Sequence, residues 1–189
     1  MDTTEHTAPA VTDPERQFVG CLLSLPLSEV RPVLAGMQAD DLASPTCGYV
    51  LQLVIELAAD GTPPAPVAVY SHAISTGRAG GEHDRHRLSL WLAETYQTAQ
   101  VPLLASYLKT VVLEAAWRRA VARHSRRLWQ AVEHSPTDVL AELVDDTHAC
   151  DDLWDRYQQA CGPVPAPREP SEPTTPAAGR GELVGGERS

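Results

Sequence analysis

The stretch that decides the fold runs from Pro102 to Tyr157, PLLASYLKTVVLEAAWRRAVARHSRRLWQAVEHSPTDVLAELVDDTHACDDLWDRY. After the opening proline, apolar residues recur at helical spacing to about His134, which predicts one long helix. Its apolar residues fill about half of the circumference, whereas a helix covered by one layer needs a stripe only somewhat wider than about 100°. We therefore expect a second partner for this helix, from another subunit. The interface candidates on the arc are Tyr107, Val111, Leu113, Trp117, Val121, Leu128 and Trp129.

A strong helix-start signal follows the long helix almost at once. In Ser135-Pro136-Thr137-Asp138, the serine suits the cap, the proline suits the first helical position and the aspartate can reach back to the cap. Apolar residues then continue at helical spacing to Tyr157. Because two helices joined by so short a turn must run antiparallel, residues 102–160 are predicted to form a helical hairpin.

Residues 13–101, which precede the hairpin, contain the start and stop signals of several shorter helices. The predicted helices begin at the Asp13-Pro14 cap, then span about 28–36 and 47–59, resume at Val67 after the prolines at 63, 64 and 66, and pass through Leu88 to Leu92 after a loop, GRAGGEHDRH, at 77–86. We therefore predict an all-α fold, with a small helical globule followed by a long antiparallel hairpin. Residues 1–12 and 161–189, rich in proline, glycine or polar residues, are expected to be disordered.

The composition fits a soluble helical protein. Apolar residues make up 43% of the chain, and the single Phe beside abundant Leu, Ala and Val favours helix packing over a sheet. The four cysteines form no CxxC pair, no signal sequence opens the chain, and no apolar run approaches the roughly 20 residues of a membrane span, which predicts a cytoplasmic location. A single lysine beside many arginines, alanines and prolines is typical of a GC-rich coding sequence and suggests an actinobacterial source.

Residue types that could carry catalysis have simpler structural explanations. His83 and His86 in the charged loop could bind a metal, but no second ligand pair follows at zinc-like spacing. Cys47 and Cys150 sit among apolar helical positions, where cysteine acts as a small hydrophobe. The acidic pairs Asp145-Asp146 and Asp151-Asp152 suit the wet face of a helix. The sequence therefore predicts no enzyme and no cofactor.

Basic residues group on the long helix opposite the apolar arc. Lys109, Arg119, Arg123, Arg126 and Arg127 are the candidate nucleic-acid contacts. A net charge of −10 argues against binding of a phosphate backbone by the whole molecule, so such contact would be local and secondary. By the same angular count Arg118 points into the apolar arc, where a buried guanidinium needs a partner, so it is predicted to be a structural anchor.

Several motifs, in this order, resemble the N-terminal domain of DnaB-type replicative helicases. The resemblance covers about residues 13–155, and its segment from Asp41 to Val69 aligns without a gap. The matching positions are Glu15, Val19-Gly20 and Leu22-Leu23, then Asp41-Leu42, Pro45 and Gly61-Thr62-Pro63, then Tyr107 to Val111 with Arg118 to Val121. The chain departs from the pattern at Leu42 and Ala65, where the family has Phe and Asp, and it has a proline-rich tail where a helicase continues into its ATPase domain.

The resemblance implies an interaction role in DNA replication. In that family hairpins pair between subunits, dimers build a ring-shaped collar, and the collar binds primase and loader proteins. It implies that this chain associates with itself, with a dimer as the minimum, and has a replicative helicase, a primase or a helicase loader as a partner. The alternative from the residues themselves is a dimeric DNA-binding regulator that uses the basic face; a metal-dependent enzyme ranks last.

We predict that the purified protein does not hydrolyse ATP. A phosphate-binding loop needs a glycine-rich turn followed by a lysine, and the single lysine, Lys109, lies in SYLKTVVL with no glycine near it. A phosphate-release assay tests this, and turnover abolished by a substitution in this chain would contradict it.

Overall fold

The computed structural model describes residues 13–162, and in that range the chain forms helices without a β-strand. The all-α prediction is therefore confirmed. The predictions for residues 1–12 and 163–189 lie outside the described residues, while Cys161, expected to begin the tail, ends the last helix. The elements are α1 (Pro14–Leu22), α2 (Leu27–Leu34), the 3-10 helix η1 (Ala39–Asp41), α3 (Pro45–Ala59), α4 (Pro66–Ser75), α5 (Glu82–Thr98), the 3-10 helix η2 (Pro102–Leu104), α6 (Ala105–His134), α7 (Thr137–Asp145) and α8 (His148–Cys161).

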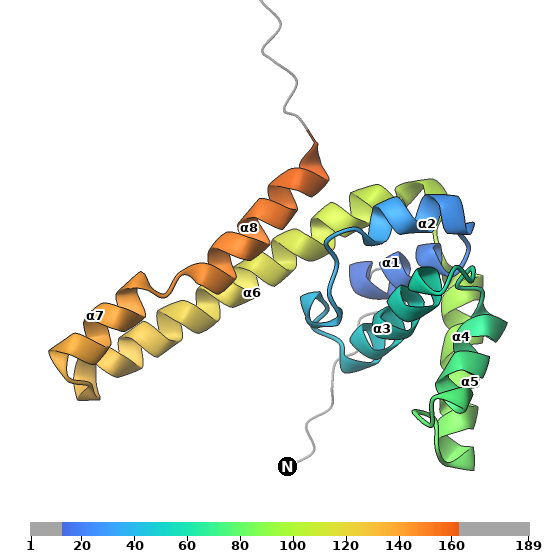
Figure 1. Ribbon diagram of the computed structural model, residues 1–189, viewed down its shortest axis with the longest axis horizontal. Helices are drawn as coiled ribbons and strands as arrows, with labels where there is room; N and C mark the ends of the chain where they lie inside the picture. The colour runs from blue at the N-terminus through green and yellow to red at the C-terminus, as the bar shows by residue number, and fades with distance from the viewer. Residues whose placement is uncertain (1–12, 163–189) are drawn as a thin grey trace, which may run out of the picture.

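Helices α1 to α5 form a globule at one end of α6, and α7 and α8 return along the rest of α6 (Figure 1). Helix α1 lies at the centre, in contact with α3, α5 and α6, and its Phe18 and Leu22 are fully buried. The first half of α6 completes this core through Leu108, Val112 and Leu113. The predicted boundary after residue 101 therefore marks the approach to α6 and not the edge of the globule.

Local signals place the helix ends of the globule. Asp13 caps α1 by accepting hydrogen bonds from the backbone N–H groups of Glu15 and Arg16, and Ser44 caps α3 through the N–H of Cys47. Helix α3 stops at Asp60 because Gly61 adopts a φ of +79°, which a residue with a Cβ rarely reaches, and the N–H of Thr62 then bonds back to the carbonyl of Leu57.

Three sequence predictions about local structure are wrong. The charged stretch predicted as a loop at 77–86 is already helical from Glu82, because Glu82 and Asp84 favour the first turn of a helix. The return arm of the hairpin is two helices, α7 and α8, separated at Asp146 and Thr147. Ser135 also does not cap α7: the helix begins at Thr137 with Pro136 in the cap position and no side-chain cap bond.

The contact between α1 and α5 predicts a steric effect at Gly20. A Cβ there would lie 2.9 Å from the carbonyl oxygen of Thr95 and 2.9 Å from the Cβ of Ala99, so the backbone would have to move. We expect Gly20→Ala to lower the free energy of unfolding by about 1 to 2 kcal/mol, since overpacking exceeds the gain in helix propensity. Gly80→Ala is the control, because its Cβ would meet only an atom at 3.9 Å. Urea unfolding that ranks the two variants equally would contradict this packing.

Candidate functional site

The arms of the hairpin are joined by apolar and aromatic contacts. Leu153 of α8 is buried in the core cluster, and the Trp154 ring lies against Trp117 of α6 with the ring centroids 4.9 Å apart. Tyr157 continues this row, at 5.5 Å from Trp154. The phenol pKa of Tyr157 is raised by its hydrogen bond with Cys161. The Trp117 ring therefore packs against the chain's own return arm.

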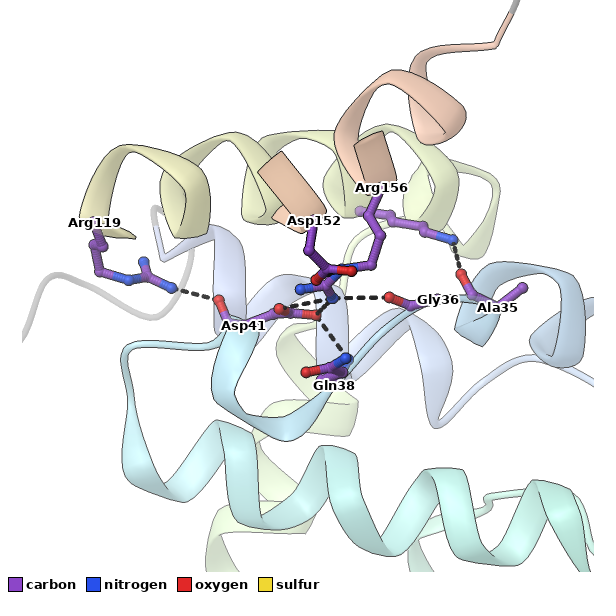
Figure 2. Close-up of polar contacts among 8 residues, drawn as sticks. Ala35, Gly36, Gln38, Asp41, Arg119, Asp152 and Arg156 are labelled. Carbon is purple, nitrogen blue, oxygen red and sulfur yellow. Dashed lines mark hydrogen bonds and ion pairs between the residues drawn. The ribbon is translucent and has the colours of Figure 1, made fainter. Parts of the chain in front are cut away.

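A buried ion pair fastens α8 to the globule (Figure 2). Nη1 of Arg156 lies 2.8 Å and 3.0 Å from the two carboxylate oxygens of Asp41, and it also donates to the carbonyl of Gly36 at 2.9 Å. Asp152, one turn earlier on α8, accepts from Nε of Arg156 at 2.9 Å. Only 3% of the Asp41 surface is exposed, so its charge has little water to stabilise it. We call this set, Asp41, Arg156, Asp152 and Gly36, the clasp.

Two cations of α6 reach the same region of the globule. Arg119 donates to the carbonyl of Asp41 and pairs with Glu15 at 3.2 Å. Glu15 in turn accepts from the N–H groups of Ala43 and Ser44, each at 2.8 Å. Lys109 donates to the carbonyl of Ala35 at 2.6 Å, and burial lowers the pKa of its ammonium group. These contacts and the clasp tie residues 35–44 to both arms of the hairpin.

An apolar face of the hairpin is left uncovered beyond the globule. Trp129 is 72% exposed and Val132 is 64% exposed on α6, with Val121 at 37%. Val139 and Val144 of α7 are exposed as well. Helix α7 has no buried residue, and its apolar residues Leu140 and Leu143 are half-buried. Large apolar side chains gathered in this way on a helix pair are typical of an interaction surface.

The structure divides the predicted interface candidates into two groups. Leu113 is fully buried in the chain's own core, so it is not available to a second subunit, and Trp117 faces α8. Both are on the side of α6 that faces the α1 helix and the return arm. The candidates with exposed side chains are Tyr107, Val121 and Trp129, and those that are half-buried are Val111 and Leu128.

The prediction for Arg118 is wrong. Its side chain is 70% exposed and pairs with Glu114, one turn earlier on the same helix, at 2.7 Å. The cation that anchors α6 to the globule is the next residue, Arg119. The sequence reading also missed Arg156, whose carboxylate partner lies 115 residues away. Asp41 did carry a signal, because it is the first residue of the Asp41-Leu42 match to the helicase domain.

The predicted basic face is only partly open. Lys109 and Arg119 are engaged with the globule, and Arg127 lies 3.8 Å from Asp146 of the return arm. Arg123 and Arg126 remain as exposed cations of this set. The surface that could meet a phosphate backbone is thus much smaller than the sequence pattern suggests.

The residues considered for metal or nucleophilic chemistry lie apart. His83 and His86 stand on the first turns of α5, and within residues 13–162 no group of three or more His, Cys, Asp or Glu side chains is placed to hold a metal ion. Cys47, in the first turn of α3, is buried, and this burial raises its thiol pKa to about 11. A thiol with so high a pKa is a poor nucleophile at neutral pH. Of the helices described, none has the length and apolar character needed to cross a membrane.

The clasp predicts a large cost for removing its arginine. Arg156→Ala leaves the carboxylate of Asp41 buried without its cation, and breaking a buried ion pair from one side typically costs about 3 to 5 kcal/mol. Arg118→Ala is the matched control, since an exposed pair one turn apart contributes at most about 0.5 kcal/mol. Chemical unfolding of both variants measures the difference. Equal stability of the two variants would show that the clasp does not hold the hairpin.

Comparison with known proteins identifies the fold. No protein-family model matches the chain, and no curated protein matches it in sequence. Among solved structures, the N-terminal domain of DnaB helicase from Mycobacterium tuberculosis superposes with a TM-score of 0.59 at 21% identity, over 75% of this chain and 95% of that one. The chain therefore has the fold of the N-terminal domain of DnaB helicase, as its sequence motifs predicted.

Proposed function

We propose that this protein is a non-catalytic assembly module that pairs with a second copy of itself through the open face of α6. The observation that carries the proposal is the spacing of residues on that face, which alternates between four and three along the whole helix. The residues are Tyr107, Val111, Glu114, Arg118, Val121, Ser125, Leu128 and Val132. Such spacing is the heptad pattern of helices that pair side by side. This stripe, which we call the α6 seam, lies opposite the buried residues Leu108, Val112 and Ala116.

The polar residues of the seam favour an antiparallel pair. In a parallel pair in register, Glu114 would face Glu114 and Arg118 would face Arg118, and like charges at such positions repel. In an antiparallel pair related by a twofold axis, Glu114 of each copy meets Arg118 of the other, and Val111 meets Val121. The same register brings Leu128 beside Leu104, which is also exposed. Trp129 flanks the seam and would cover its edge.

The replication context comes from the likeness to the DnaB domain and from the motifs that match it. The Mycobacterium tuberculosis structure that shares this fold is the N-terminal domain of a DnaB helicase. We propose that the paired module acts in DNA replication in the cytoplasm, and that its partners are a replicative helicase, a primase or a helicase loader. These partners would bind the paired module, because pairing occupies the α6 seam.

The DNA-binding regulator is the second candidate, and the exposed pair Arg123 and Arg126 is what favours it. Two exposed arginines in each copy, on a chain with a net charge of −10, attract a phosphate backbone only weakly. Salt separates the two functions, because phosphate-led binding weakens steeply as salt is added and an apolar seam responds little.

The open face predicts opposite outcomes for two tryptophans. Trp129→Ala should keep the helix content and melting temperature of the parent, because its side chain is 72% exposed, and should weaken self-association about 30-fold, or about 2 kcal/mol. Trp117→Ala should instead destabilise the fold by about 3 kcal/mol, since it removes the contact with Trp154. Sedimentation equilibrium and circular dichroism measure these two quantities.

Tyr96→Ala is the control for loss of an exposed aromatic ring, because Tyr96 is exposed on α5 in the globule. It should leave sedimentation unchanged. A parent protein that sediments as a monomer at several hundred micromolar would remove the basis of the proposal, as would a Tyr96→Ala variant that dissociates as readily as Trp129→Ala.

A further inference from the structure

The short turn that leads into α6 carries apolar side chains that the described helices leave uncovered. Helix η2 has no buried residue, Leu103 is 88% exposed, and Val101 and Leu104 beside it are exposed as well. We call these three residues the η2 patch. Residues 99–108 also carry no charged side chain, in a chain of which 21% is charged. Exposed apolar residues without neighbouring charges are typical of the centre of a protein interface.

A second uncovered apolar pair lies near the opposite end of α6. Trp129 is exposed and Leu128 beside it is half-buried. The globule lies at the η2 end of the helix, and α7 lies at the other end (Figure 1). Leu103 and Trp129 are 26 residues apart, which is about 39 Å along a helix that rises about 1.5 Å per residue. The two sites therefore cannot contact each other within one chain.

A second copy in the antiparallel arrangement brings the two sites together. Glu114 of one copy meets Arg118 of the other in that arrangement, so the twofold axis passes at the level of residue 116. Leu103 lies 13 residues before this level and Trp129 lies 13 residues after it. The twofold axis therefore sets Leu103 level with Trp129 of the second copy, one residue from the contact between Leu104 and Leu128.

We propose that the η2 patch is the docking site for Leu128 and Trp129 of the second copy. This inference rests on the proposed pairing and adds the residues that fix its register. Neighbouring residues of a helix point about 100° apart, so Leu128 and Trp129 lie on the two edges of the α6 seam and cover the patch from both sides. The twofold axis forms the contact twice, as an apolar cluster at each end of the seam.

The charges of the seam and the η2 patch select the same register. A slip of the second copy by seven residues in either direction preserves the heptad pattern, but it sets Leu103 against Ala122 or Pro136. The same slips move Glu114 away from Arg118. The register that pairs the charges at the middle of the seam is therefore the one that covers the apolar residues at its ends.

Four variants of the full-length chain test the contact by sedimentation equilibrium. Leu103→Glu and Trp129→Lys each set a charge against an apolar side chain, and each should raise the dissociation constant of the pair about 30-fold. The two substitutions in one chain should bind about tenfold more tightly than either alone, because the introduced carboxylate then lies against the introduced ammonium group of the second copy. Sites about 39 Å apart in one chain would show no such coupling.

The fourth variant, Val67→Glu, is the matched control, because Val67 is exposed on α4, outside the hairpin, and receives the same side chain. It should leave the dissociation constant unchanged. A Leu103→Glu variant that associates like the parent would overturn the docking site and leave the assembly proposal in place. A double variant that loses the sum of the two single effects would do the same. A parent protein that stays monomeric would instead remove the assembly itself, and the docking site with it.

Discussion

The ion pair between Asp41 and Arg156 is the contact on which the relation between globule and hairpin depends. A carboxylate this deeply buried is tolerated only with a cation and further hydrogen bonds, which Arg156 and the N–H of Gln38 supply, while the carbonyl of Gly36 accepts a hydrogen bond from Arg156. The cation comes from the last helix and the carboxylate from a short 3-10 helix of the globule. The pair can form only when α8 lies back along α6, so it selects this arrangement of the return arm.

Fixing the return arm decides which side of α6 remains open. The globule occupies one side of the first half of the helix, α8 covers the neighbouring side at Trp117, and α7 covers the far end thinly. What remains is the α6 seam, with Glu114 and Arg118 near its middle and valines on both sides of them. The apolar arc of α6 is too wide for one neighbour because the helix packs against its own core on one side and against a second copy on the other.

Local signals in the sequence predict much of the fold, but they do not reveal contacts between residues that are far apart in the sequence. The Asp13 cap of α1, the end of α3 at residue 59 and the hairpin follow from turn chemistry and periodicity within a few residues. The angular count failed at Arg118 because the wide apolar arc of α6 includes two faces of the helix. Neighbouring residues on a helix point about 100° apart, and it is Arg119, not Arg118, that contacts the globule. The break between α7 and α8 escaped as well, since apolar spacing continues across it. Arg156 could not be found, because nothing near it in sequence reveals a carboxylate 115 residues away.

The measurement that tests the central claim most directly is hydrogen exchange of the full chain at two protein concentrations, one well below and one well above that at which it self-associates. Pairing through the α6 seam suppresses helix opening at the contact. The account predicts that backbone amides from Val121 to His134 exchange more slowly at the higher concentration, while those of α3 and α4 exchange at the same rate in both. Exchange that does not depend on concentration anywhere in α6, or slowing confined to the globule, would contradict it.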